Sequence, residues 1–482
     1  MWTLSKMMGI LFNFKFFTKT QEEREWPQAL AIVTASMAAF VAGLLTSWSS
    51  PFLIKITNDK VSYNISEKDA SYFTIIQPTA MVLTCVIFSI LCDKIGRKRT
   101  LLLITVPHLC SWILAAVAKN VYVFYASRCC AGIGDGCLFA ALPMYIGEVA
   151  SPKVRGTWGN CLVSSMYLGE FVIQAMGYFL NVKQTSYACM PISILFFVLF
   201  WFMPESPYYL IMQDCDEEAK RALAFLNRKL DVEDDFQKLR MDVKRQMSEA
   251  GTWKDLFTIK SNRKALISAI FLRSSQQLGG TTVFIMNIEF IFEKSKGGVS
   301  PQVSSMIYLG LCLLLNILVI VFVVERLGRR LCYILSLSLA SIPLLVLSVY
   351  FFIEKYVSDV DLGFLNWIPI VAMISYQICN SFGMAVIPTL MLGELFSTSV
   401  KSKAMTVLMI DFGLMIFVTN NVLHALQSVI GLCGPFLLFA VSNIISAFMT
   451  MWLVPETRGK TLEQIQQLLK KEVDERIEVV RI

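Results

Sequence analysis

The sequence predicts an all-α membrane protein of twelve transmembrane helices, arranged as two parallel six-helix halves with short cytoplasmic helices between them. Composition is the first observation: 55% of the 482 residues are hydrophobic and 16% are charged, against roughly 25% charged in a soluble domain. The second is a series of apolar runs that reach the ~20 residues that a spanning helix needs, and the third is an internal repeat. The predicted spans are residues 26–54, 70–92, 100–118, 121–149, 157–181, 184–204, 265–292, 297–324, 331–353, 362–393, and the end of one span and all of another within 412–455.

Basic residues cluster in short loops next to the predicted spans: "DKIGRKR", "SPKVRG", "ERLGRR", "SVKSK" and "ETRGK". These loops all fall on one side of the membrane if the N-terminus is inside, which is the positive-inside pattern. The glycosylation sequon that begins at Asn64 falls on the opposite side. We therefore expect an integral protein of the plasma membrane, in contact with membrane lipid and with both termini cytoplasmic.

The linker between the halves concentrates charged residues among apolar residues at helical spacing, which predicts amphipathic cytoplasmic helices. The 13 cysteines show neither a disulfide framework nor the spacing of metal ligands. Since no set of nucleophile and base appears either, we expect no enzyme, no cofactor and no metal. The net charge of +7 comes with basic residues in short loops between spans, so we expect no nucleic acid, and no obligate protein partner is evident. The expected segments are a cytoplasmic N-terminal segment 1–28, an N-terminal half 29–204, a cytoplasmic helical linker 205–264, a C-terminal half 265–455 and a cytoplasmic tail 456–482.

Three short motifs occur once in each half and in the same order. "DKIGRK" at 93–98 is echoed by "ERLGRR" at 325–330, "GEVAS" at 147–151 by "GELFS" at 393–397, and "PES" at 204–206 by "PET" at 455–457. Each motif lies at the cytoplasmic end of a predicted span, so the two halves have the same orientation. Parallel repeats of this kind are typical of transporters.

The repeated motifs combine acidic and basic residues, and arginine binds carboxylates with fixed geometry. Such pairs could latch the two halves together on the cytoplasmic side, so that breaking them opens the protein inward. The basic residues alone could also serve only as topology signals. The predicted gating residues are Asp93, Arg97, Glu148, Arg155, Glu205, Glu325, Arg329, Arg330, Glu394, Lys401 and Glu456.

The motifs "DKIGRKR", "RCCAGIGDG", "PMYIGEVASPKVRG", "PESPYYL", "QQLGG", "ERLGRR", "GELF" and "PETRGKTLEQI" resemble the sugar porter branch of the major facilitator superfamily. The resemblance covers roughly residues 29–470, with every motif in its expected span. The stretches "GLLTSWSSP" and "MLGELF" are similar to insect facilitated trehalose and glucose transporters. The resemblance implies that a small-molecule sugar is bound midway across the membrane and moved by alternating access.

Span seven supplies much of the sugar site in this family, and here it contains "QQLGGTTVFIMN" at 276–287. Amides offer the donors and acceptors that sugar hydroxyls need, although they could also bond neighbouring helices. The predicted substrate-binding residues are Gln276, Gln277, Thr282, Asn380, Ser381 and Thr389. The predicted points of helix flexing are Gly279, Gly280 and Pro388.

Several usual hexose ligands of the family are replaced. Thr282 stands in place of an Asn, and Met286 and Asn287 stand in place of two aromatic residues. Val163 and Leu313 occupy the positions of a Gln and another Asn. The substrate could therefore differ, bind weakly, or use other residues. Two further replacements are Thr389 for a Trp and Tyr208 for the Arg of "PESPR".

The function that these observations favour is facilitative uniport of trehalose or of a hexose such as glucose. Proton-coupled porters of the family carry an Asp at the position of Leu45, so coupling would need Asp411 or Asp135 instead. The open alternatives are a proton-coupled sugar symporter, a transporter of another small polar solute, and a non-transporting sugar sensor.

Overall fold

The computed structural model confirms an all-helical fold, with no strand among the residues that it describes. Nine helical segments of this part of the chain are long and apolar enough to cross a membrane. Three further spans, described below, complete a fold of twelve spans in two halves. The described residues are 25–151, 154, 158, 160–229, 231–248, 251–295, 298–322, 328–357, 365–396, 398–458, 464 and 467.

The N-terminal half contains six spans, two of which are interrupted by short breaks. Local side chains set some helix starts: the Asn120 side chain accepts the N–H of Val123 at 3.0 Å, and the Asn181 side chain accepts that of Gln184 at 2.9 Å. The spans are α2 (Trp26–Thr46) with α3 (Ser49–Asn58), α5 (Phe73–Ile95), α6 (Arg97–Leu103) with α7 (Thr105–Val117), α8 (Val121–Val149), α10 (Cys161–Phe179) and α11 (Val182–Trp201), while α4 (Glu67–Ser71) lies in a loop.

The C-terminal half repeats this plan, and two of its spans are also interrupted. One break separates α16 from α17 at Gly279 and Gly280, and the other separates α21 from α22 at residues 383–386. The spans are α16 (Lys260–Leu278) with α17 (Thr281–Lys294), α18 (Pro301–Phe322), α20 (Arg329–Tyr356), α21 (Ile368–Phe382) with α22 (Ile387–Leu395), α23 (Thr398–Ile430) and α24 (Cys433–Leu453).

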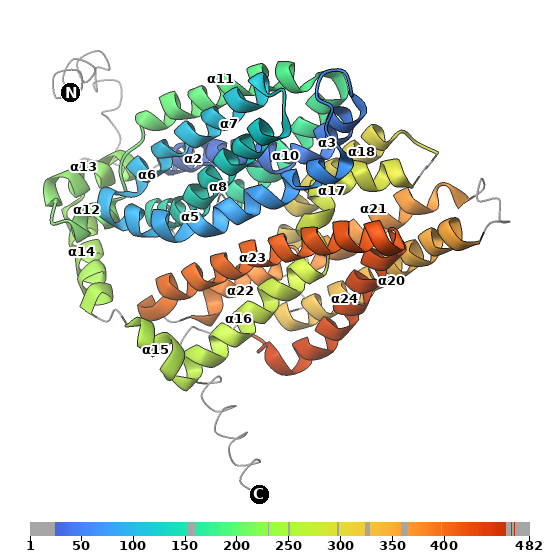
Figure 1. Cartoon of the computed structure of the whole chain (residues 1–482). Coiled ribbons are helices and arrows are strands. Elements are labelled where there is room, and N and C mark those ends of the chain that lie inside the picture. Colours follow the sequence, from blue (N-terminus) through green and yellow to red (C-terminus); the bar gives the residue numbers. More distant parts are fainter. Residues whose placement is uncertain are drawn as a thin grey trace, which may run out of the picture.

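The buried apolar residues of the two halves form largely separate clusters, with Phe290 of α17 packed into a cluster of the N-terminal half. In the C-terminal half, Phe284 packs edge-on against Tyr376 at 5.0 Å and is stacked with Phe436 at 5.5 Å between ring centroids. The halves meet along three helix pairs, α5 with α23, α10 with α18, and α3 with α17. Figure 1 shows the two bodies lying one above the other.

Between the halves, four short helices gather at one end of the bundle, called here the linker end (Figure 1). The opposite end, which carries α4 and the loop after α17, is called the far end. The first three linker helices share a small core that includes Leu210, Leu223 and Phe236, while Leu256 of the fourth packs into the core of the C-terminal half. They are α12 (Pro207–Met212), α13 (Asp216–Asn227), α14 (Glu233–Ser248) and α15 (Trp253–Thr258).

The internal repeat has the same local structure in both halves. Gly96 and Gly328 precede α6 and α20 with φ of +101° and +88°, a conformation that favours glycine. A carboxylate then accepts N–H groups of the first turn of each helix, at 2.9 Å from Lys98 to Glu205 and at 3.1 Å from Arg329 to Glu456. Each acid follows the last span of its own half, so the motif ties the third span of a half to its sixth.

Candidate transport site

A cavity of about 470 Å³ lies between the two halves. Its walls come from α2, α5, α8 and α10 on one side and from α16, α17, α22 and α23 on the other. Helices of both halves therefore have to move when either end of this cavity opens or closes. The polar and charged lining residues are Thr46, Gln77, Asp135, Tyr167, Glu170, Arg273, Gln276, Gln277, Thr281, Thr282, Thr389 and Lys401.

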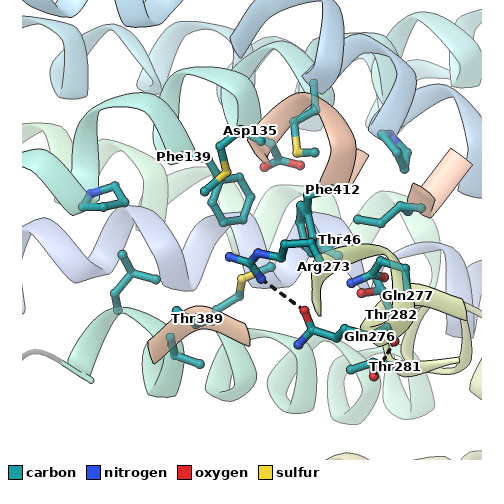
Figure 2. Close-up of a pocket in the computed structure, with 18 of the residues that line it drawn as sticks. Thr46, Asp135, Phe139, Arg273, Gln276, Gln277, Thr281, Thr282, Thr389 and Phe412 are labelled. Carbon is teal, nitrogen blue, oxygen red and sulfur yellow. Dashed lines mark hydrogen bonds between the residues drawn. The ribbon is translucent and has the colours of Figure 1, made fainter. Parts of the chain in front are cut away.

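The structure brings four of the six predicted substrate-binding residues to this cavity: Gln276, Gln277, Thr282 and Thr389. Figure 2 shows these four around it. The two others, Asn380 and Ser381, are not among its lining residues. Both are buried within α21, where the Asn380 amide donates to the Gln377 side chain at 3.3 Å and the Ser381 hydroxyl donates to the Gln377 carbonyl at 2.9 Å.

Gln276 lines the cavity from α16 and is also bonded to its neighbours. Its Nε2 donates to the carbonyl oxygen of Met384 at 2.9 Å, in the break between α21 and α22. Its Oε1 accepts from Nη1 of Arg273 at 3.1 Å, the bond dashed in Figure 2. These bonds hold the amide in one orientation, which pre-positions a group for a ligand.

Gln277 is more available than its neighbour. The residue is 1% exposed, and its Oε1 has no hydrogen-bond partner in the described part of the chain. Buried polar groups are nearly always paired in proteins. An unpaired amide oxygen on a cavity wall is therefore suited to accept a hydrogen bond from a ligand hydroxyl.

The predicted flexing glycines form a break in span seven. Gly280 has φ of +95°, and α16 ends and α17 begins on either side of the pair. The break is held in place, because the Tyr376 hydroxyl donates to the Gly279 carbonyl at 2.9 Å and the Thr281 hydroxyl donates to the Asn380 side chain at 3.2 Å. Pro388 lies in the first turn of α22, where proline leaves helix hydrogen bonds intact.

The opposite wall contains a buried polar chain in the N-terminal half. The Gln77 amide donates to Asp135 at 2.7 Å, and its oxygen accepts from Arg128 at 3.0 Å. Arg128 also donates to the Leu45 carbonyl at 2.7 Å and lies over the Trp48 ring. The Leu45 backbone carbonyl is thus one of the two hydrogen-bond acceptors of Arg128 Nη1, together with the Gln77 side chain.

The sequence reasoning did not find several of the lining residues. Arg273 lies one helical turn before Gln276, so its charge inside an apolar span was the signal that could have identified it. Thr46, Gln77 and Thr281 carry no such signal, because only packing brings them to the cavity. The apolar part of the wall is formed chiefly by Met81, Met166, Met286, Met405, Met409, Phe139 and Phe412.

At the linker end the described ion pairs of Arg97 lie within the N-terminal half, while other pairs join the linker helices to one another. Arg97 pairs with Glu148 at 2.9 Å and with Asp93 at 3.3 Å, all three in the N-terminal half. The Ser206 hydroxyl also donates to Glu148. Burial raises the pKa of Glu205 above its ordinary value, against the opposing effect of the N–H groups that it accepts.

The other predicted gating residues are only partly described. Arg155 and Glu325 lie outside the described residues, as does the side chain of Glu394. Glu456 accepts the backbone N–H groups of Arg329 and Arg330, and Lys401 lines the cavity. A latch between the halves therefore stays a prediction for the conformation in which the linker end closes.

The far end is closed by bonds that cross between the halves. The Gln174 amide of α10 donates to the carboxylate of Glu289 in α17. The Glu289 N–H donates to the Ser50 hydroxyl at 3.2 Å, and Lys294 pairs with Glu67 at 3.2 Å. Glu289 is completely buried, so these bonds exclude water from the far side of the cavity.

The cavity extends from this closed end toward the linker end. Its lining includes Gly147, close to the end of α8, and Lys401, close to the start of α23. Both positions belong to the repeated motifs of the linker end. The structure thus represents a conformation closed at the far end, with the cavity reaching the other.

Comparison with solved structures gives the same architecture. A structure of the major facilitator superfamily proton:xylose symporter XylE bound to 6-bromo-6-deoxy-D-glucose superposes with a TM-score of 0.74, at 18% identity over 92% of this chain and 100% of that one. An inward open conformation of XylE from E. coli gives a TM-score of 0.70, at 18% identity over 92% of this chain and 98% of that one. At this identity the likeness shows the fold alone, which is the twelve-helix major facilitator fold.

Curated relatives share more of the sequence. The facilitated trehalose transporter Tret1 of Polypedilum vanderplanki is 29% identical over 447 residues, which cover 92% of this chain and 88% of that protein. Trehalose transporter 1 of Drosophila melanogaster is 28% identical over 447 residues, again 92% of this chain, and the chain spans about half, 52%, of its length. Residues 3–469 match the family described as "Sugar (and other) transporter", so the chain belongs to that family of membrane transporters.

Proposed function

We propose that this protein moves a sugar across the plasma membrane by facilitated, alternating access. The observation that carries the proposal is the cavity between the halves, lined by Gln276 and Gln277 and closed at the far end by bonds between the halves. A carrier needs one site that each end can reach in turn. Closure at one end, with the cavity extending to the other, supports such a cycle.

The linker end is the cytoplasmic end in this proposal, because the basic loops lie there. The structure then corresponds to an inward-facing conformation. Asn64 is exposed in the loop between α3 and α4 at the far end, where a glycan could be attached outside the cell. Both termini are cytoplasmic in this topology.

The substrate class follows from the relatives and from the lining. The curated relatives are named as trehalose transporters, so trehalose is the first candidate substrate. Glucose is the hexose to test beside it. Amides and threonine hydroxyls both donate and accept hydrogen bonds, as a polyhydroxyl ligand requires. No lining residue forms a covalent intermediate in this cycle, so the protein would carry its substrate unchanged.

The direct test uses the full-length protein reconstituted into liposomes. Labelled trehalose or glucose should enter down its gradient, saturably, and equally with or without an imposed proton gradient. Uptake of neither sugar by correctly inserted protein, over a wider panel of sugars, would refute sugar transport. Uptake that depends on the proton gradient would replace uniport by symport.

Substitution of Gln276 tests the site. Gln276→Ala removes a cavity-wall amide, and a lost hydrogen bond of about 1.4 kcal/mol corresponds to a KM about 10-fold higher. Uptake kinetics give this value, and protein amount in the liposomes controls for yield. Gln213→Ala, at an exposed position after α12, is the matched control and should leave KM unchanged.

A further inference from the structure

Arg273 places a permanent positive charge on the wall of the central cavity. It lies in α16, one turn before Gln276, and is 7% exposed. Figure 2 shows its guanidinium close to Gln276 and Phe412, with Phe139 and Asp135 across from it. A guanidinium keeps its proton in proteins, so burial cannot neutralise it as it can a carboxyl group.

The neighbours of Arg273 leave part of its hydrogen-bonding capacity unused. Nη1 donates to Gln276 Oε1 at 3.1 Å, and the guanidinium carbon lies 5.0 Å from the centre of the Phe412 ring. Nε has no hydrogen-bond partner among the described residues, and none of the carboxylates described forms an ion pair with the side chain. Its partners are thus a neutral amide and an aromatic ring.

The carboxylate nearest in sequence to Phe412 does not serve as the counter-ion at contact distance. Both oxygens of Asp411 accept from the Ser274 hydroxyl, at 3.0 and 3.2 Å. The electrostatic attraction between Asp411 and Arg273 acts beyond the distance of an ion pair. A cation in the membrane interior with no close counter-ion is expensive, and such residues commonly mark a substrate path.

The charges that face the cavity differ between its two walls. Arg273 and Lys401 belong to the C-terminal half, whereas Asp135 and Glu170 belong to the N-terminal half. Glu170 Oε2 has no hydrogen-bond partner in the described chain. Carboxylates accept hydrogen bonds from hydroxyl groups, while a guanidinium binds a carboxylate through two parallel bonds. A ligand with hydroxyls at one end and an acid group at the other satisfies both walls.

We propose that the substrate is an anionic sugar, a sugar acid whose carboxylate is bound by Arg273 while its hydroxyls face the amides and the acidic wall. The proposal rests on the proposed function and changes its preferred substrate from a neutral sugar to a sugar acid. It also gives a reason for the replaced hexose ligands at Thr282, Met286 and Thr389, because a charge-assisted pair compensates for lost neutral hydrogen bonds.

The test compares glucose with glucuronate, which differ only at C6, where a carboxylate replaces a hydroxymethyl group. In proteoliposomes, wild-type protein should take up glucuronate with a KM about 10-fold or more below that for glucose. Arg273→Gln should abolish this preference, because it raises the KM for glucuronate more than the KM for glucose, and Arg273→Lys should restore part of it. Arg263→Gln, at an exposed position of the same helix, is the matched control.

Three results would overturn the proposal. The first is uptake of glucose by a protein that does not transport glucuronate and is not inhibited by it. This result would leave the proposed sugar transport intact. The second is an equal loss of both sugars in Arg273→Gln, which indicates a structural role. The third applies if the protein moves no sugar at all, and is the absence of glucuronate binding to the detergent-solubilised wild type by calorimetry. In that case, binding to the wild type that is lost in Arg273→Gln would support the proposal.

Discussion

At the scale of single residues, the helix break beside the cavity depends on Gly280. Its φ of +95° is strained for any residue with a Cβ. A Cβ there would lie 2.3 Å from the Phe284 ring. That ring is fully buried against Tyr376 and Phe436, so it has no room to move away.

Gly280→Ala should therefore destabilise the protein by about 1–3 kcal/mol and displace the start of α17. The expected result is a lower melting temperature of the detergent-purified protein by intrinsic fluorescence, together with weaker sugar binding. Gly298→Ala is the control, because a Cβ at that residue would have its nearest neighbour at 3.6 Å, an ordinary contact. An unchanged melting temperature for Gly280→Ala would contradict the strain argument.

At the scale of elements, the third span of each half is tied to the sixth at the linker end. In the N-terminal half the nearly buried guanidinium of Arg97 adds spans two and four to this tie. Arg97 is 2% exposed, pairs with Asp93 of α5 and Glu148 of α8, and lies over the Tyr209 ring. The tie holds each half together as a rigid body, which is what movement of one half against the other requires.

Arg97→Ala should cost about 3–5 kcal/mol, because it leaves the Glu148 carboxylate without its cation in a half-buried position. We expect poor yield and a strongly lowered melting temperature, with partial recovery in Arg97→Lys. Arg99→Ala changes the same residue type two positions along, at an exposed site. Similar effects of Arg97→Ala and Arg99→Ala would show that the pairing contributes little.

At the scale of the whole molecule, bonds between the halves lie at the far end and also between α10 and α18, where Asn160 donates to Asn316 at 3.0 Å. The far end is held by the buried bond from Gln174 to Glu289, while Lys294 and Glu67 form an exposed pair. Exposed pairs contribute about 0–1 kcal/mol. The two buried bonds of Glu289, from the Gln174 amide and to the Ser50 hydroxyl, are thus the main polar ties between the halves at the far end.

Gln174→Ala should shift the protein away from the conformation closed at the far end. Spin labels at Val61 and Ser300, two exposed far-end positions on different halves, report the separation in a cysteine-free background. We expect a larger population of long distances in Gln174→Ala by double electron–electron resonance, and little change in Lys294→Ala. Identical distance distributions in wild type and Gln174→Ala would show that apolar packing, rather than this bond, closes the end.

The sequence by itself determined the membrane class, the twelve spans and the repeat, because these depend on composition and on order along the chain. The run from Gln276 to Gly280 already indicated both a polar wall and a helix break, since amides and paired glycines are costly in lipid without a cavity beside them. Local patterns of this kind need no knowledge of neighbouring helices.

Only the tertiary structure decided which polar side chains share the cavity. Asn380 and Thr389 belong to the same interrupted span, yet Asn380 bonds within the C-terminal half while Thr389 lines the cavity. Gln77 and Arg273 come from different halves and meet the same cavity from opposite walls. The reason is physical: the orientation of a side chain in a helical span depends on how the helices pack against each other, and no local pattern in the chain encodes that packing.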